Sequence, residues 1–343
     1  MRCGRVLALV LASAFWSCAE YPALTADSPA PVATLDAPPA RTRVAERVLI
    51  VSIDGLRPDA VQAAKAETLK GLIARGAYCA TAQTIRPSVT LPSHTSMLSG
   101  LDAPRHQVYW NSYHRGYLPY PTVFSVVAQS GAKSAMIFSK DKFHFLAHPR
   151  CVNFVYGPPV PDKPAPPEDY RDPDQQETLL LRQREAALRP EERNTTADDL
   201  ARVFTAEWPR GSFRLTFLHF READVMGHRR GWMSPDYLEA VASIDRALGA
   251  VVATVERNGG FEKTALIVTS DHGGSGRDHY WFLQPGKAEN LTIPWICVGP
   301  GVPAGLRIER SIRTVDTAPT ALALIGLGSP ANIEGKAVSE VLR

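Results

Sequence analysis

Five short apolar runs, separated by helical segments, constrain the fold of this chain more than any other feature. Each run has the length of one strand, and the first, RVLIVSI, is apolar enough for a strand buried on both faces of a sheet. The runs occupy residues 47–53, 134–138, 213–220, 264–270 and 293–299. Helical patterns lie between them and after the last one. This alternation predicts an α/β fold, a three-layer αβα sandwich with a mostly parallel central sheet.

The first residues have the three-part pattern of a secretory signal. Two arginines precede an apolar run at 6–16, and small residues follow. The run is too short to span a bilayer comfortably, so residues 1–19 predict a signal peptide cleaved after Ala19. We therefore expect an exported protein, periplasmic or secreted, and Cys18 leaves a lipid-anchored form open.

The rest of the chain divides into a linker and one domain. Residues 20–46 are rich in proline and alanine, which predicts a disordered or extended tether. The catalytic domain is expected at 47–343. Within it, about 157–196 is a proline-rich and then polar stretch, which we interpret as an excursion from the sheet.

Charge and composition exclude several classes of protein. The chain has 38 basic and 35 acidic residues, and two of the basic residues lie in the predicted signal peptide. The mature chain therefore has 36 basic and 35 acidic residues, a net charge of about +1. This balance does not indicate binding to a nucleic-acid polymer, and no further apolar run predicts a transmembrane segment. Cys79, Cys151 and Cys297 allow at most one disulfide. The oligomeric state is not indicated by the sequence.

Potential metal ligands follow three of the expected strands. They are Asp54, the pair Asp224 and His228, and the pair Asp271 and His272, with Asp278 and His279 following in the same segment. Each of these residues alone is ordinarily a turn former or an exposed polar residue. Because carboxyl ends of parallel strands meet at one edge of a sheet, three such groups together favour a centre for zinc or a similar divalent ion.

A hydroxyl stands at the start of a predicted helix in the segment PSVTLPSHTSMLSG. Thr90 precedes Pro92, an order that places Thr90 at or near a helix N-terminus. The backbone N–H groups and dipole there favour an anion such as phosphate. The alternative is that Thr90 only caps the helix.

Together these motifs resemble a known family. VSIDGLRPDA, VTLPSHTSMLSG, a downstream WN, ADVMGH and TSDHGG occur in the order seen in the alkaline phosphatase superfamily. The resemblance is closest to its nucleotide pyrophosphatase/phosphodiesterase branch and extends from Arg47 to about Leu327. It implies an alkaline phosphatase-like fold and a metal-dependent phosphoric ester hydrolase that acts on a small phosphate-ester or nucleotide substrate.

The resemblance also implies roles for single residues. Thr90 would be the nucleophile that becomes phosphorylated, and Asn111 would stabilise a phosphoryl oxygen. Two divalent ions, expected to be zinc, would be bound. The ligands implied are Asp54, Asp271, His272 and the Thr90 oxygen for one ion, and Asp224, His228 and His279 for the other.

The chain departs from the branch at some positions. Ser93 stands where the phosphodiesterases commonly have asparagine, and His279 follows His272 more closely than in long members of the family. The first departure leaves the nucleotide preference open, and the second bears on the third ligand of the second ion.

Three alternatives to a phosphodiesterase or pyrophosphatase remain. A sulfatase needs an oxidisable Cys or Ser followed by Pro-Ser-Arg, whereas this chain has Thr90 and His94 at the corresponding places. A phosphomonoesterase would need a further cation, for which Arg86 or Arg115 are the candidates. A protein of another class, a non-catalytic secreted binding protein that contains metal, is the third alternative.

Overall fold

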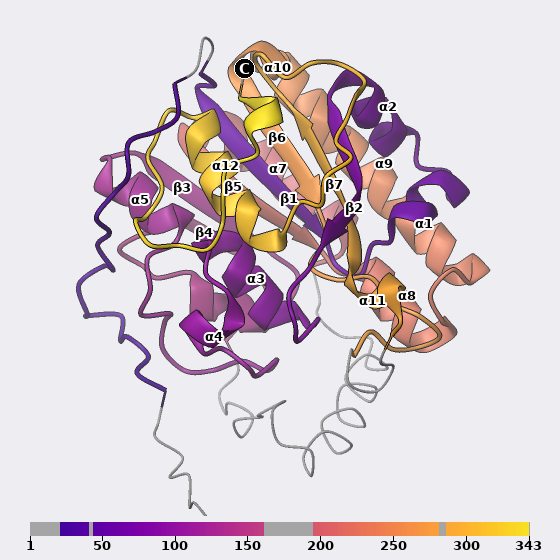
Figure 1. Ribbon diagram of the computed structural model, residues 1–343, viewed down its shortest axis with the longest axis horizontal. Coiled ribbons are helices and arrows are strands. Elements are labelled where there is room, and N and C mark those ends of the chain that lie inside the picture. The colour runs from indigo at the N-terminus through magenta and orange to yellow at the C-terminus, as the bar shows by residue number, and fades with distance from the viewer. Residues whose placement is uncertain (1–20, 41–43, 161–194, 281–285, 343) are drawn as a thin grey trace, which may run out of the picture.

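A single mixed sheet forms the centre of the domain (Figure 1). The computed structural model describes residues 21–40, 44–160, 195–280 and 286–342. The strand order is β4-β3-β5-β1-β6-β7-β2-β8. The strands are β1 (Arg47–Ile53), β2 (Ala77–Gln83), β3 (Lys133–Ile137), β4 (Phe154–Tyr156), β5 (Phe213–Phe220), β6 (Thr264–Thr269), β7 (Thr292–Val298) and β8 (Leu306–Arg307).

The sheet is mostly parallel, as predicted. Strand β7 is antiparallel to both of its neighbours, β6 and β2, and the other pairings among the described strands are parallel. Strand β1 lies between β5 and β6, in the register Ser52 to His219 and Ser52 to Thr269. The carboxyl ends of these three central strands therefore meet at one edge.

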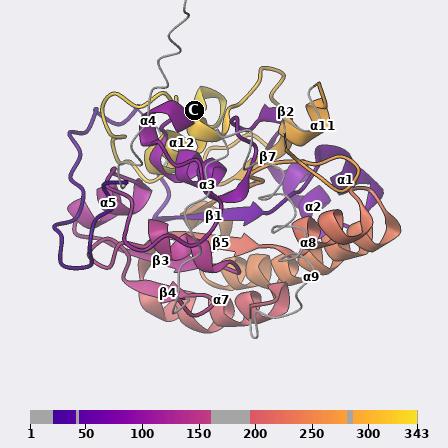
Figure 2. The same cartoon turned by 90° about the horizontal axis from the view of Figure 1, so that it is seen from below.

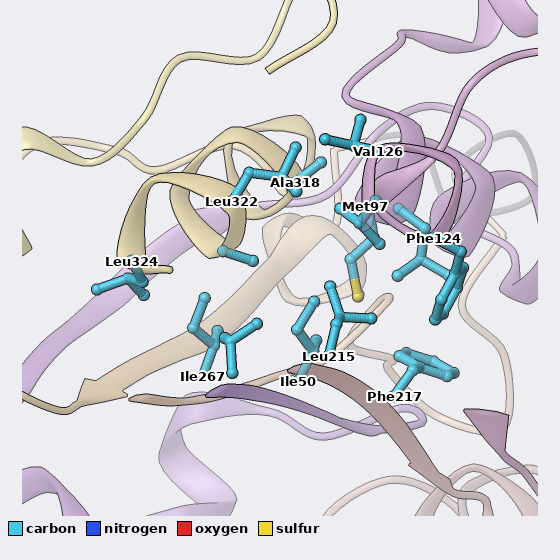
Figure 3. Packing of buried hydrophobic residues seen from close by; sticks show 14 of the residues in the cluster. Ile50, Met97, Phe124, Val126, Leu215, Phe217, Ile267, Ala318, Leu322 and Leu324 are labelled. Carbon is cyan, nitrogen blue, oxygen red and sulfur yellow. The ribbon is translucent and has the colours of Figure 1, made fainter. Parts of the chain in front are cut away.

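Helices cover both faces of the sheet, which confirms the three-layer αβα sandwich (Figure 2). Side chains alternate along each strand, so Ile50, Leu215 and Ile267 pack toward one helical layer (Figure 3). Leu49 packs toward the other layer. The first layer contains α3 (Thr90–Ser99), α4 (Ala103–His106), α5 (Val123–Gln129), η1 (Asp141–Leu146), η2 (Thr314–Asp316), α12 (Thr317–Leu324) and η3 (Ser339–Val341). The second contains α1 (Pro58–Ala63), α2 (Glu67–Arg75), α7 (Ala197–Gly211), α8 (Glu222–Arg230), α9 (Pro235–Arg257) and α10 (Gly260–Lys263). The short helix α11 (Ala288–Leu291) precedes β7.

The five apolar runs are β1, β3, β5, β6 and β7, each to within one residue of the predicted bounds. Strands β2, β4 and β8 and helix α7 were not predicted from the sequence. Most of the predicted excursion, residues 161–194, and the whole predicted signal peptide lie outside the described residues.

Residues 21–40, part of the predicted linker, run along the domain in extended form. Leu24 and Tyr117 exchange backbone hydrogen bonds of 2.8 Å, and the Asp36 N–H donates to the Ser329 carbonyl at 2.9 Å. Backbone contacts thus attach this segment to the domain.

The described residues include no helix that is both long and apolar enough to cross a membrane. The three cysteines of the described chain are buried and form no disulfide with one another. Cys297 lies in β7 with no exposed surface, as expected for a small apolar residue in a buried strand.

Candidate active site

Two central strands place the first group of potential ligands. Asp54 follows β1, and Asp271 and His272 follow the adjacent β6. All three side chains are completely buried. The His272 Nε2 lies 3.3 Å from Asp54 Oδ1 and 3.3 Å from Asp271 Oδ2. We call these three residues the strand cluster.

The second group comes from a helix and a loop. Asp224 and His228 are one turn apart on α8, and their Oδ1 and Nε2 atoms are 3.3 Å apart. The loop after β6 brings His279 Nε2 to 4.0 Å from the same Asp224 oxygen. We call these residues the helix cluster. The stacked rings of His272 and His279, 3.6 Å apart, join it to the strand cluster.

Both clusters fit divalent ions. Within each, one potential ligand atom per residue lies within 4.8 Å of the others. Asp54 Oδ1, Asp224 Oδ1, Asp271 Oδ2 and His272 Nε2 are buried, with no hydrogen bond to any described residue. Buried polar atoms without partners are costly, and carboxylate oxygens and imidazole nitrogens are ligands for zinc-like ions. The structure thus groups the six residues as the sequence analysis did.

The histidines of both clusters are oriented for binding. His228, His272 and His279 each donate from Nδ1 to a backbone carbonyl, at 3.0, 2.9 and 2.5 Å respectively. In the neutral ring the other nitrogen, Nε2, then carries a lone pair. In each of the three, that nitrogen faces the carboxylates of the clusters, and hydrogen bonds of this kind normally orient metal-binding histidines.

The density of carboxylates shifts the pKa values inside the site. Burial and the charge of Asp54 raise the pKa of Asp271 to about 7. Burial opposes protonation of His272, but Asp271 and Asp54 outweigh it and raise the His272 pKa to about 9. Burial also acts to raise the pKa of Asp54, yet the charge of Lys140 and the nearby rings of His219 and His272 hold it well below its usual range. The site therefore concentrates negative charge that favours bound cations.

Thr90 is the first residue of α3 and is almost completely buried. Val89 occupies the N-cap position, and no side-chain hydrogen bond caps the helix. The Thr90 hydroxyl instead lies 3.3 Å from the Lys140 ammonium. The alternative interpretation of Thr90 as a helix cap is therefore wrong, and the hydroxyl is left available in the site.

Asn111 lies next to the nucleophile candidate. Its Oδ1 accepts a hydrogen bond of 2.9 Å from the Leu91 N–H. This contact fixes the side chain at the start of α3. Because the oxygen faces the helix, the two N–H groups of the amide remain as donors on the other side.

Lys140 is a candidate site residue that the sequence patterns did not predict. Its ammonium nitrogen lies 2.6 Å from Asp54 Oδ2 and 2.8 Å from Asp224 Oδ2, so it contacts both clusters as well as Thr90. Burial opposes its charge, but Asp224 and Asp54 raise the Lys140 pKa and keep it protonated. Its position shortly after the strand at 134–138 was the signal, since ligands gather at strand ends.

The cations considered in the sequence analysis lie elsewhere. Arg86 and Arg115 are both exposed, whereas Lys140 is the cation beside Thr90. His94, one turn after Thr90 on α3, donates from Nδ1 to the Thr90 carbonyl at 2.8 Å, and its Nε2 lies 2.7 Å from Ser52 Oγ. His94 thus connects the first turn of α3 to strand β1.

Solved structures with a similar fold include a nucleotide pyrophosphatase/phosphodiesterase, a phosphonate monoester hydrolase and a sulfatase. Murine ectonucleotide pyrophosphatase/phosphodiesterase 5 aligns with a TM-score of 0.61 at 14% identity, covering 87% of this chain and 100% of that chain. The phosphonate monoester hydrolase from Silicibacter pomeroyi gives 0.61 at 17% identity, covering 87% and 76%. A 2-O glycosaminoglycan sulfatase gives 0.60 at 15% identity, covering 87% and 74%. At such identities the similarity shows the shared fold.

Curated relatives match over shorter stretches. Arylsulfatase K of Danio rerio is 30% identical over 118 residues, 34% of this chain and 22% of that protein. The 2,3-bisphosphoglycerate-independent phosphoglycerate mutase of Synechococcus elongatus is 32% identical over 140 residues, 38% of this chain and 25% of that protein. The chain thus spans about a quarter or less of the length of these relatives.

The sequence model of one family covers most of the domain. It is the type I phosphodiesterase / nucleotide pyrophosphatase family, and it matches residues 48–284. The match includes both clusters, Thr90, Asn111 and Lys140. Together with the fold, it shows that this chain belongs to the type I phosphodiesterase / nucleotide pyrophosphatase family of the metal-dependent alkaline phosphatase superfamily.

Proposed function

We propose that this protein hydrolyses phosphodiester or pyrophosphate bonds of small substrates through a phospho-threonine intermediate on Thr90. One observation carries the proposal. The Thr90 hydroxyl, free of any cap role, shares the Lys140 ammonium with a carboxylate from each cluster. A nucleophile candidate, a fixed cation and both groups of potential ligands therefore converge at one point.

The strand and helix clusters would each hold one divalent ion, with zinc the best fit to their carboxylate and imidazole ligands. Bound ions supply electrostatic stabilisation to attacking and leaving oxygens, and make a hydroxyl more acidic. A threonine hydroxyl is otherwise a poor nucleophile at neutral pH. The site residues position the substrate around that chemistry.

The chain's own residues provide the remaining steps. Thr90 Oγ1 forms a bond to phosphorus as the bond from phosphorus to the leaving oxygen breaks, and the hydroxyl proton passes through solvent to that leaving oxygen. Lys140 is protonated and cannot accept the hydroxyl proton, so its role is to stabilise negative charge near Oγ1. The Asn111 amide donates to a non-bridging oxygen. Water then cleaves the phospho-threonine and restores the hydroxyl.

A phosphomonoesterase is the second candidate, and Lys140 is the observation in its favour. A monoester carries one more ionisable non-bridging oxygen than a diester, and a fixed ammonium beside the nucleophile suits that extra charge. The structure of the murine phosphodiesterase 5 in complex with AMP supports a substrate of nucleotide size. The kcat/KM values on a diester and on a monoester distinguish the two candidate functions.

A sulfatase activity is disfavoured by the nucleophile position. The relatives include arylsulfatase K, but this chain has Thr90 and His94 where sulfatases need an oxidisable residue and an arginine. A non-catalytic metal-containing protein is disfavoured because the nucleophile candidate is present together with both clusters.

Steady-state kinetics on matched aryl phosphodiester, phosphomonoester and sulfate substrates test the proposal. We expect the highest kcat/KM on the diester. Thr90→Ala should retain its metal content and lose at least about 10³-fold in kcat, because the attacking atom is gone. Equal activity on all three substrates would reject the diester preference. Unchanged turnover by Thr90→Ala would remove Thr90 from the nucleophile role.

Export is a further part of the proposal, and it rests on the pattern of residues 1–19. Fractionation of the producing cells and N-terminal sequencing of the mature protein test it. We expect a chain that begins at Glu20. A lipid-modified chain that begins at Cys18 would indicate the anchored form, and an intact Met1 in the cytoplasm would contradict export.

A further inference from the structure

His219 is a completely buried histidine that neither cluster contains. It lies near the end of β5, on the face of the sheet that packs against α3. The preceding residues on that face, Leu215 and Phe217, are apolar and belong to the core (Figure 3). A polar ring is unexpected next to these apolar side chains if its role is packing alone.

Both ring nitrogens of His219 have partners. Nε2 lies 3.0 Å from Asp54 Oδ2, and Nδ1 lies 2.8 Å from Ser139 Oγ. An ionised carboxylate only accepts hydrogen bonds, so Nε2 carries the proton and donates to Asp54. In the neutral ring Nδ1 then accepts from the Ser139 hydroxyl. The contacts therefore define a chain in which Ser139 donates to His219 and His219 donates to Asp54.

This chain distinguishes the two oxygens of Asp54. Oδ2 receives His219 and the Lys140 ammonium, at 3.0 and 2.6 Å. Oδ1 makes no hydrogen bond to any part of the described chain and lies 3.3 Å from His272 Nε2, inside the strand cluster. One oxygen is thus held by the protein, and the other is directed toward the other ligands.

The ring of His219 is also held in its plane. Phe143 packs against it with ring centroids 4.5 Å apart, and His94 lies edge-on at 5.1 Å. The rotation that would take Nε2 away from Asp54 is therefore obstructed by packing. Ser139 comes from the same short segment as Lys140, so this segment after β3 fixes both contacts to Oδ2.

We propose that His219, oriented by Ser139, is a positioning residue that holds Asp54 Oδ2 and thereby reserves Oδ1 for the ion of the strand cluster. The inference rests on the proposed metal centre but not on the substrate or on turnover. Hydrogen bonds to metal-binding carboxylates commonly change metal affinity by about 10-fold to 100-fold. The expected effect is therefore on affinity at one of two sites.

Zinc titration against a chromophoric chelator tests this in the full-length protein. We expect His219→Phe, which keeps the ring but loses both nitrogens, to weaken one of the two sites by about 10-fold to 100-fold. His219→Gln, which keeps a side-chain N–H donor, should recover part of that loss. Ser139→Ala should weaken the same site by a smaller factor, about 3-fold to 10-fold, since only the orientation of the ring is lost.

His106→Gln is the matched control. His106 is buried to the same extent and lies 3.0 Å from Ser96 Oγ, but it contacts neither cluster. It should leave both zinc affinities unchanged. Melting temperatures with a chelator and with saturating zinc give a second readout. The rise in melting temperature on adding zinc should be smaller for His219→Phe than for wild type. A purely structural role would instead lower the melting temperatures with chelator and with zinc equally.

Two outcomes would overturn the inference. One is a folded His219→Phe variant with two sites of wild-type affinity. The other is a wild-type protein that binds no zinc, manganese or cobalt. If His219→Phe does not fold, Ser139→Ala and His219→Gln decide, and wild-type affinity in both rejects the positioning role. Failure of the proposed function is separate, because a protein without turnover would still show these differences in affinity.

Discussion

The strand cluster and the helix cluster offer the same kinds of ligand atom, but different parts of the fold hold them. The strand cluster lies at the ends of two hydrogen-bonded central strands, and all its side chains are fully buried. The Gly55 N–H also donates to Asp271 Oδ1 at 3.2 Å. Backbone geometry therefore fixes this cluster.

The helix cluster depends more on packing between side chains. Asp224 and His228 belong to α8, and His279 belongs to the loop after β6. The Trp232 ring packs against both histidines, with centroids 5.1 Å and 5.8 Å away. We therefore expect the strand cluster to form the more rigid site and to bind its ion more tightly.

Lys140 is the group shared by the two clusters, and its removal should have the largest effect on stability. Lys140→Met leaves Asp54 and Asp224 without their ammonium partner in a buried site. We expect a loss of roughly 3 kcal/mol in the free energy of unfolding when metal is chelated. Saturating zinc should restore much of it, since the ions supply the missing positive charge. Urea denaturation with and without zinc measures both values.

Lys65→Met, at an exposed position, is the control for the charge change and should cost less than 1 kcal/mol. Equal losses for the two variants would show that the contacts of Lys140 with the carboxylates do not stabilise the metal-free protein. A loss for Lys140→Met that zinc leaves unchanged would place its effect outside the two clusters.

Graded removal of metal separates the two sites. We expect dialysis against increasing chelator to remove the ion of the helix cluster first, at a free-zinc concentration at least about tenfold higher, or 1.4 kcal/mol. Metal analysis should show a plateau near one ion per chain. His279→Ala should bind a single ion at zinc concentrations that fill both wild-type sites.

Loss of both ions together, or loss of the ion of the strand cluster first, would contradict the expected difference in affinity between the two sites. Retention of two ions by His279→Ala would mean that another residue completes the helix cluster. Asp271→Ala is the complementary variant, and it should lose the tighter of the two sites.

The same difference explains what the sequence could predict. Asp54, Asp271 and Thr90 were identifiable because each follows an apolar run or begins a helix, so position along the chain predicts position at the sheet edge. The assignment of His279 as the third ligand of the second ion depended on a family resemblance, because a local sequence pattern does not predict the path of a loop. Its place beside Asp224 became evident only with the fold.

Lys140 and His219 were missed for physical reasons that differ. Lys140 follows a predicted strand, but a lysine there is ordinarily solvent-exposed, and only the sheet order reveals the two carboxylates opposite it. His219 lies inside a predicted strand, where its side chain's face and depth follow from pairing with β1. Strands β2 and β8 were missed because they contain few large apolar residues.

The pH dependence of the metal-free protein should have opposite signs at the two clusters. The raised pKa values of Asp271, about 7, and His272, about 9, mean that the folded state binds more protons than the unfolded state. Their contributions to stability are lost as pH rises, from about 4 to 7 for Asp271 and from about 6.5 to 9 for His272. Burial lowers the pKa of His279, so its contribution is lost as pH falls below about 6.5.

Chelator-treated protein, unfolded with urea at a series of pH values, measures these slopes. Each group contributes at most about 1.4 kcal/mol per pH unit. Asp271→Asn should flatten the decline between pH 4 and 7, and His279→Gln should flatten the loss below pH 6.5. A wild-type stability that rises steadily from pH 4 to 9 would contradict the signs assigned to the strand cluster.

The smallest expected effect tests whether packing of Trp232 holds the helix cluster. A Cβ on Gly227 would lie 2.5 Å from the indole ring, so Gly227→Ala must displace the ring that supports His228 and His279. Overpacking of this kind costs about 1 kcal/mol, and we expect zinc affinity to fall at the helix cluster alone. Isothermal titration calorimetry resolves the two sites.

Gly71→Ala, in helix α2, is the matched control, because a Cβ there meets no atom within 4 Å. It should raise the free energy of unfolding by about 0.5 to 1 kcal/mol through helix propensity and leave both zinc affinities unchanged. If Gly227→Ala weakened both sites equally, the two clusters would be mechanically coupled through the stacked rings of His272 and His279. The distinction between a backbone-held and a packing-held site would then have to be abandoned, because one support would serve both ions.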